Sequence, residues 1–113
     1  MDLDNVVIRE KRKTPRVKQK VPVELVLNED VTTINGDTCD LSCVGAKVIL
    51  DHALTPQTQY AVTLNLPSGP QHLKGLVVRS ERVKGVFEVS LYFNDITMET
   101  RQKINDFVKE KWV

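Results

Sequence analysis

Short segments in which apolar and polar residues alternate recur through most of this chain, and they limit its fold more than any other feature. The clearest runs from Tyr60 to Leu66, where large apolar side chains occupy every second position. A period of two is typical of a β-strand with one buried face. The same interpretation applies to residues 21–27, 37–41, 46–50, 73–80 and 86–93. Six or seven short strands at this spacing predict a barrel or a sandwich.

The segments between these strands carry turn signals. Asn35-Gly36 favours a tight hairpin connection, and residues 67–70 (Pro-Ser-Gly-Pro) form a turn by composition. Pro22 fits the first long strand only near its start or on an edge, because proline has no backbone N–H to donate. We further expect turns or loops at residues 28–30, 51–59 and 81–85.

The last part of the chain changes to a helical period. Thr97 is a suitable N-cap, and Glu99 adds an acidic group to the first turn. The positions that then fall on one helical stripe are Ile104, Phe107, Val108 and, at the end, Lys111 or Trp112. We expect this stripe to lie over one end of the barrel.

The length of 113 residues allows one hydrophobic core but not two. We divide this single domain into an N-terminal segment with a basic arm (residues 1–20), a barrel (21–96) and a C-terminal helix (97–113). Residues 1–8 carry no cap or turn signal that assigns them to a helix or strand. No apolar run exceeds three residues, so we expect neither a membrane span nor a secretory signal, and we expect the chain to be cytoplasmic.

Positive charge is concentrated near the N-terminus, although the formal net charge is only +1. Between residues 9 and 20, a single Glu10 accompanies seven basic residues: Arg9, Lys11, Arg12, Lys13, Arg16, Lys18 and Lys20. This charge density predicts a flexible, solvated arm when nothing is bound. Pro15 keeps the segment between Arg12 and Arg16 from being helical, so both guanidinium groups are free to reach an anion.

The cysteines and histidines do not form a recognisable metal or catalytic set. Cys39 and Cys43 are close together, but His52 and His72 are far from them in sequence, which makes a poor zinc site. We expect both cysteines to be reduced and packed as small apolar side chains. Neither histidine has a nucleophile or acid at a recognisable spacing, so we predict no catalytic residues.

The point where one strand ends and the next begins carries a group of polar residues. Asp40, Ser42 and Gly45 put a carboxylate, a hydroxyl and a flexible backbone position within six residues. A carboxylate can accept hydrogen bonds from the ring nitrogens of a base, and a hydroxyl can donate or accept. Glycine lets a ligand approach the backbone closely. Such a corner can also be purely structural, with Asp40 and Ser42 capping their own backbone.

Taken together, these residues resemble the PilZ domain family. Its two signatures are R-x-x-x-R in an N-terminal loop, matched by Arg12 and Arg16, and [D/N]-x-S-x-x-G at a strand turn, matched by Asp40, Ser42 and Gly45. The resemblance extends from about residue 11 to the C-terminal helix. It implies a mostly β fold, namely a six-stranded antiparallel barrel with a C-terminal α-helix. It also implies that the domain binds the bacterial second messenger cyclic di-GMP.

The resemblance also implies a role for each signature residue. Arg12 and Arg16 would pair with phosphate or with the O6 and N7 edge of guanine, and would stack on the purine. Asp40 and Ser42 would hydrogen-bond the guanine, and Gly45 would hold the turn open. Lys11 and Lys13 are possible secondary contacts, and in this family the residue at position 11 influences whether one or two ligand molecules bind. No metal and no cofactor beyond this ligand are expected.

The function that follows is that of a receptor without catalysis. Cyclic di-GMP would order the arm and so change the interaction with an unidentified effector protein or domain, in a process such as motility or exopolysaccharide synthesis. One alternative is a basic module that binds nucleic acid or anionic surfaces, but a strand-binding barrel normally exposes aromatic residues, and only 5% of this chain is aromatic. Another is a ligand-free interaction adaptor, although such members usually lose signature residues. Ser90 stands where the family often has glycine, which puts local packing in doubt.

Overall fold

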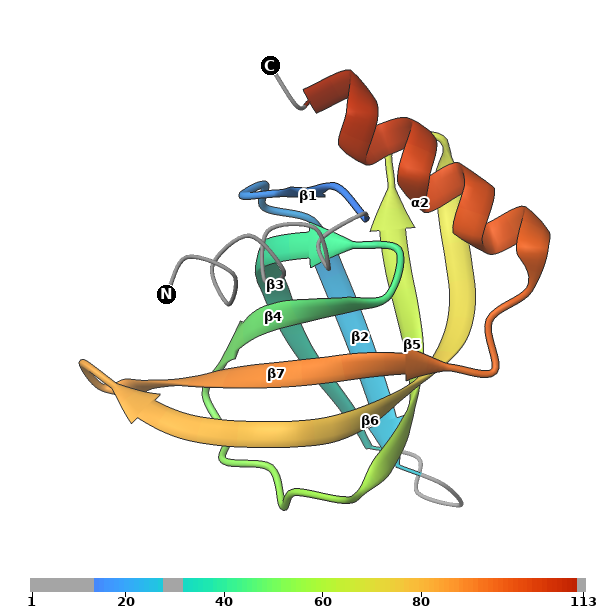
Figure 1. The fold of residues 1–113 in the computed structure, drawn as a ribbon. Coiled ribbons are helices and arrows are strands. Elements are labelled where there is room, and N and C mark those ends of the chain that lie inside the picture. Colours follow the sequence, from blue (N-terminus) through green and yellow to red (C-terminus); the bar gives the residue numbers. More distant parts are fainter. Residues whose placement is uncertain (1–13, 28–31, 112–113) are drawn as a thin grey trace, which may run out of the picture.

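The computed structural model describes residues 14–27 and 32–111, and Figure 1 shows a strongly curved sheet with one helix at its end. The strands are β1 (Arg16–Val17), β2 (Pro22–Leu27), β3 (Thr33–Ser42), β4 (Gly45–Leu50), β5 (Gln59–Leu66), β6 (Gly69–Val83) and β7 (Val86–Asn94). The helix is α2 (Met98–Lys111). The predictions for residues 1–13, for the turn at 28–30 and for Trp112 fall outside the described residues.

The strands form a closed antiparallel barrel. The sheet order is β1-β3-β2-β5-β6-β7-β4, and an additional pairing of β3 with β4 joins the two ends of the six longer strands. The short β1 lies outside this ring and pairs with the end of β3. The predicted six-stranded barrel with a C-terminal helix is therefore confirmed. Pro22 is the first residue of β2, as its missing N–H requires.

The alternating pattern identified most of the inward-facing side chains. In β5, Tyr60, Val62, Leu64 and Leu66 are buried while the residues between them are exposed or partly exposed. Fully buried residues from the other strands meet them in one core: Leu25, Leu41, Val48, Leu50, Val77 and Val89. Leu27 is an exception, because it is 36% exposed at the end of β2.

Helix α2 closes one end of the barrel (Figure 1). Thr97 is its N-cap, since the Thr97 hydroxyl accepts a hydrogen bond of 3.1 Å from the Thr100 N–H. The Thr100 hydroxyl donates in turn to the buried side chain of Gln71 on β6. Ile104, Phe107 and Val108 are buried against the core, as predicted. The helix contacts β1, β3 and β6, so it lies next to the outside strand.

Two strands of the barrel, β3 and β6, each contain a β-bulge. Thr38 pairs with Val48 and Asp40 with Lys47, which leaves Cys39 as the extra residue of β3. On the other side, the β6–β7 pairing shifts its register in the same way, and Val78 is the extra residue of β6. A bulge increases the local twist and redirects the side chains that follow it. Both bulges lie close to the β3–β4 turn.

Three sequence-based expectations were wrong in detail. Asn35-Gly36 is not a hairpin turn but part of the continuous strand β3, opposite Glu24 and Val23 of β2. The turn expected at residues 81–85 is shorter, because β6 continues to Val83 and only Lys84-Gly85 make the turn, both with positive φ. The arm is not entirely a solvated loop, since residues 16–17 form β1.

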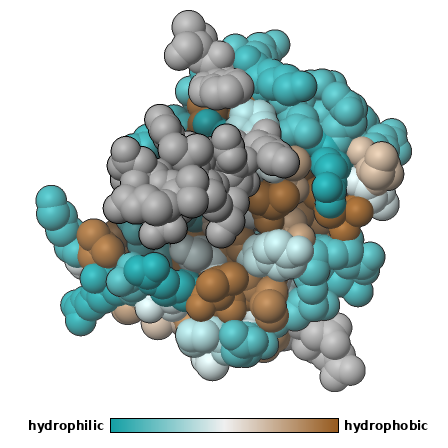
Figure 2. All heavy atoms as spheres, in the orientation of Figure 1, coloured by the Kyte–Doolittle hydropathy of each residue, from teal (hydrophilic) through white to brown (hydrophobic). Residues whose placement is uncertain are grey.

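Other findings concern what the described residues do not contain. No helix in the described part of the chain is long and apolar enough to cross a membrane. Within residues 14–27 and 32–111, no group of three or more His, Cys, Asp or Glu side chains is placed to hold a metal ion. On the face shown in Figure 2, apolar surface is limited to small patches between hydrophilic residues.

Candidate functional site

A hollow of about 280 Å³ lies on the outer face of the barrel, beside the turn that joins β3 to β4. The outside strand β1 borders it at one end, and β7 and the bulge of β6 border it at the other. Its lining consists of Arg16, Asp40, Ser42, Val44, Gly45, Ala46, Lys47, Val78, Ser90, Leu91 and Tyr92. Four of the five predicted signature residues are in this set, and they come from two separate segments of the chain, the arm and the β3–β4 turn.

The β3–β4 turn is held by the side chain of Ser42. The Ser42 hydroxyl accepts hydrogen bonds from the N–H groups of Val44 (3.2 Å) and Gly45 (3.3 Å), and it donates to the Gly45 carbonyl (3.4 Å). Ser42 therefore caps its own turn, which is the structural role that the sequence left open. The turn is also tied to β7, because the Phe93 N–H donates to the Val44 carbonyl.

Gly45 is required by a close approach of two strands. A Cβ atom at this position would lie 2.5 Å from the carbonyl oxygen of Leu91 in β7, which is too close for any side chain. The small residue keeps β4 against β7 and leaves the backbone of the turn open on the outer face. Gly45 is therefore necessary for the shape of the hollow.

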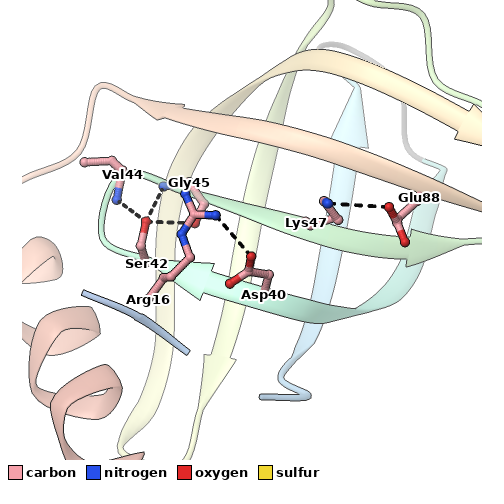
Figure 3. Close-up of polar contacts among 7 residues, drawn as sticks. All are labelled: Arg16, Asp40, Ser42, Val44, Gly45, Lys47 and Glu88. Atoms are coloured by element: carbon pink, nitrogen blue, oxygen red, sulfur yellow. Dashed lines mark hydrogen bonds and ion pairs between the residues drawn. The ribbon is translucent and has the colours of Figure 1, made fainter. Parts of the chain in front are cut away.

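Arg16 and Asp40 form an ion pair at the entrance to the hollow. The Arg16 Nη1 donates to the Asp40 Oδ2 at 3.3 Å, and Figure 3 shows the guanidinium between Asp40 and the Ser42 turn. The Arg16 side chain is 48% exposed, so one side of the guanidinium remains accessible. The second carboxylate oxygen, Asp40 Oδ1, is buried and has no hydrogen-bond partner among the described residues. A buried acceptor of this kind usually has a hydrogen-bond partner, and the described residues supply none.

Arg16 owes its position to two contacts of the arm with β3. β1 pairs Arg16 with Ser42 and Val17 with Leu41. Further along the arm, the buried Thr38 hydroxyl accepts from the Val21 N–H (2.9 Å) and donates to the carbonyl of Gln19 (2.6 Å). These bonds fix the segment between the arm and β2, because they satisfy backbone groups that β2 itself does not pair.

Charged and polar side chains continue across the sheet from Asp40. Asp40 lies opposite Lys47 of β4, and Lys47 lies opposite Ser90 of β7. Lys47 forms an ion pair of 3.5 Å with Glu88, away from the Ser42 turn (Figure 3). Arg79 is next in this row, opposite Ser90, but it pairs with Glu81 at 3.5 Å and is not part of the lining.

The two cysteines are free thiols, as expected, and differ in exposure. Cys43 is buried, while Cys39 is partly exposed at the bulge of β3. Burial raises the pKa of the Cys39 thiol, and the carboxylates of Glu88 and Asp40 raise the pKa further while Lys47 opposes them. Cys39 is therefore protonated at neutral pH and a weak nucleophile.

A comparison with protein families tests the resemblance that the signatures suggested. The model of the family described as PilZ domain matches residues 10–110, which is most of the chain. The chain belongs to the PilZ domain family. A comparison with curated protein sequences found no match.

Solved structures share the PilZ fold at low sequence identity. The inhibitor of motility MotI/DgrA from Bacillus subtilis superposes with a TM-score of 0.77 at 15% identity, over 88% of this chain and 50% of that one. The PilZ domain of YcgR from Escherichia coli, with c-di-GMP, gives 0.73 at 15% identity over 89% and 91%. The MrkH–c-di-GMP complex of K. pneumonia gives 0.75 at 13% identity over 88% and 51%. This chain thus spans about half of MotI/DgrA and of MrkH.

Within this PilZ domain, the structure brings Arg16 together with Asp40, Ser42 and Gly45 around one hollow. Arg12, Lys11 and Lys13 lie outside the described residues. Sequence reasoning did not identify the lining residues outside the two signatures, among them Lys47, Val78 and Tyr92. The alternation along residues 86–93 predicts that Ser90 and Tyr92 face outward, but their positions opposite Lys47 and Gly45 depend on strand register, which the sequence does not reveal.

Proposed function

We propose that this PilZ domain binds cyclic di-GMP in the hollow beside the β3–β4 turn. The observation that supports the proposal most is the convergence of Arg16 from the arm with Asp40 and Ser42 from the turn, in a chain that belongs to this family. Two of the similar structures, the PilZ domain of YcgR and MrkH, are complexes with c-di-GMP. Arg12, four residues before Arg16, completes the first signature.

The chemistry of each group suits part of this ligand. Arg16 can pair its planar fork with a phosphate or with the O6 and N7 edge of guanine. The Asp40 carboxylate, whose Oδ1 has no partner among the described residues, can accept from the N1–H and the exocyclic amine of guanine. The Ser42 hydroxyl is hydrogen-bonded within its own turn, so the main contribution of Ser42 is to hold the Gly45 backbone in place. Lys47 adds a positive charge on the far side of Asp40.

Ligand binding would act through the arm. A ligand paired with Arg12 and Arg16 would draw residues 9–20 over the hollow, at an entropic cost that lowers affinity but alters a large surface. β1 is next to α2, so the altered surface would include the helix end of the barrel. In this account the domain is a cytoplasmic receptor without catalysis, and its output is a changed interaction with an effector protein or domain.

Calorimetric titration tests this proposal. The purified protein is titrated with cyclic di-GMP, GMP, GTP and a short oligonucleotide at two salt concentrations, and the cyclic di-GMP titration is repeated with Arg12→Ala and Asp40→Ala. We expect saturable binding of cyclic di-GMP alone, weakened roughly tenfold to a hundredfold in both variants, because each loses a charge-assisted hydrogen bond of about 1.5–3 kcal/mol. Equal, salt-sensitive binding of every anion with Asp40→Ala unaffected would instead indicate a basic interaction module.

A further inference from the structure

Tyr92 is an aromatic side chain left open at the edge of the hollow. It is 53% exposed, whereas Tyr60, Phe93 and Phe107 are buried in the core. Tyr92 lies on the outward side of β7, and it belongs to the lining of the same hollow as Asp40 and Arg16. Tyrosine is enriched at binding interfaces, because its ring offers apolar contact area while its hydroxyl remains hydrated.

The residues between Arg16 and Tyr92 are small. Arg16 lies opposite Ser42, the Ser42 hydroxyl contacts the backbone of Gly45, and Gly45 lies opposite Tyr92. These residues form one row across β1, β3, β4 and β7, with a guanidinium at one end and a phenol ring at the other. Adjacent strands are about 4.8 Å apart, so the row is about 14 Å long. Gly45, the residue directly opposite Tyr92, has no side chain that could cover the ring.

The bulge of β6 provides an apolar border next to Tyr92. Val78 is the extra residue of that bulge, is 53% exposed and lines the hollow. Val44, on the β3–β4 turn, is 38% exposed and also lines the hollow. This end is therefore apolar and aromatic, while the end that holds Arg16 and Asp40 is charged. A ligand that fits both ends carries anionic groups and a flat apolar ring.

We propose that Tyr92 is the stacking platform of the site and carries one purine of the ligand, with Val78 at its edge. This inference rests on the proposed function and adds a binding residue outside the two signatures. A purine offers a π-face to an aromatic side chain whatever groups it has on its edge, so stacking adds affinity for the base while Asp40 reads its hydrogen-bonding edge. The separation along the row lets the two ends hold different parts of one dinucleotide.

The test is a calorimetric titration of cyclic di-GMP into wild-type protein and into Tyr92→Ala, Tyr92→Leu, Tyr92→Phe and Asp40→Ala. Tyr92→Ala loses a base–aromatic stack, so its affinity should be lower than wild type by about fivefold to a hundredfold. The affinity of Tyr92→Phe should stay within about twofold of wild type. Tyr92→Leu keeps apolar bulk without the ring and should also bind weakly. Met98→Ala, which removes a side chain that is 82% exposed and not in the lining, is the matched control and should bind like wild type.

A second measurement does not depend on affinity. With the tyrosine rings labelled for NMR, the Tyr92 ring protons should move upfield on saturation, because a stacked purine shields them. If Tyr92→Ala and Tyr92→Leu bind cyclic di-GMP as tightly as wild type while Asp40→Ala binds more weakly, the stacking role is wrong and the proposed function stands. Absence of binding by the wild-type protein would overturn both.

Discussion

Arg16 lies directly opposite Ser42 in the pairing of β1 with β3, and its guanidinium extends from there to within 3.3 Å of Asp40. A residue of the basic arm is thus held against the signature turn by backbone pairing as well as by charge. Arg16 and Asp40, which belong to different signatures, are 24 residues apart in sequence. The short β1 strand joins them into one site.

The pair of Arg16 with Asp40 should affect ligand binding much more than stability. An exposed ion pair contributes about 0–1 kcal/mol to the free energy of unfolding, so Arg16→Ala should leave the urea midpoint nearly unchanged. Its affinity for cyclic di-GMP should fall roughly tenfold to a hundredfold, and Arg16→Lys should not restore it, because a lysine lacks the planar fork. Full affinity in Arg16→Lys would indicate that only charge matters at this position.

Thr38 should be important for stability although it does not line the hollow. Thr38→Val removes the acceptor for the Val21 N–H and the donor to the Gln19 carbonyl, in a site where Thr38 is 2% exposed. Leaving buried backbone groups unpaired costs about 1–3 kcal/mol of the free energy of unfolding, measured by urea denaturation. Thr38→Ser keeps the hydroxyl and is the control. Equal stability of the valine and serine variants would contradict the role of these hydrogen bonds.

Gly45→Ala should disturb both the barrel and the site. The new Cβ would meet the Leu91 carbonyl oxygen, so β4 and β7 must separate locally. We expect a loss of about 1–3 kcal/mol in the free energy of unfolding, together with weaker binding of cyclic di-GMP. Val44→Ala, in the same turn and 38% exposed, should change stability by less than about 0.5 kcal/mol. A wild-type melting curve for Gly45→Ala would show that the turn tolerates a side chain.

The Cys39 thiol should react slowly with a thiol-labelling reagent at neutral pH. Its pKa is raised by burial and by the Glu88 carboxylate, so the thiolate fraction is smaller than for a free cysteine, and the labelling rate should keep rising above pH 9. Glu88→Gln should speed labelling and Lys47→Gln should slow it, because these side chains act on the pKa in opposite directions. The measurement uses a Cys43→Ala background, and equal rates in both variants would contradict this electrostatic account.

Local patterns in the sequence were enough to predict much of the fold. The alternation in residues 60–66 reports which side chains face the core, because each strand buries one face. Thr97 and the stripe through Ile104 and Val108 specify α2 in the same local way. The signature residues Asp40, Ser42 and Gly45 are close in sequence, so their proximity in space follows from the turn alone.

Features that depend on contacts between distant strands were not predictable. Gly36 resembles the second residue of a hairpin turn, yet its φ is not positive, and it is small because a Cβ would collide with Leu50 and with the backbone of Ile49. The register of β7 against β4 places Tyr92 beside Gly45. No local pattern encodes that pairing, and the same holds for the pairing of β1 with β3.

NMR mapping of the ligand onto the backbone tests the central claim most directly. The protein labelled with ¹⁵N is titrated with cyclic di-GMP, and the amide shifts and the Arg16 side-chain Nε–H are followed to saturation. We expect the largest changes at Ser42, Val44 and Gly45 and at the Arg16 side chain, with residues in the middle of β5 unaffected. Saturable changes confined to another face, or no changes at all, would contradict the account.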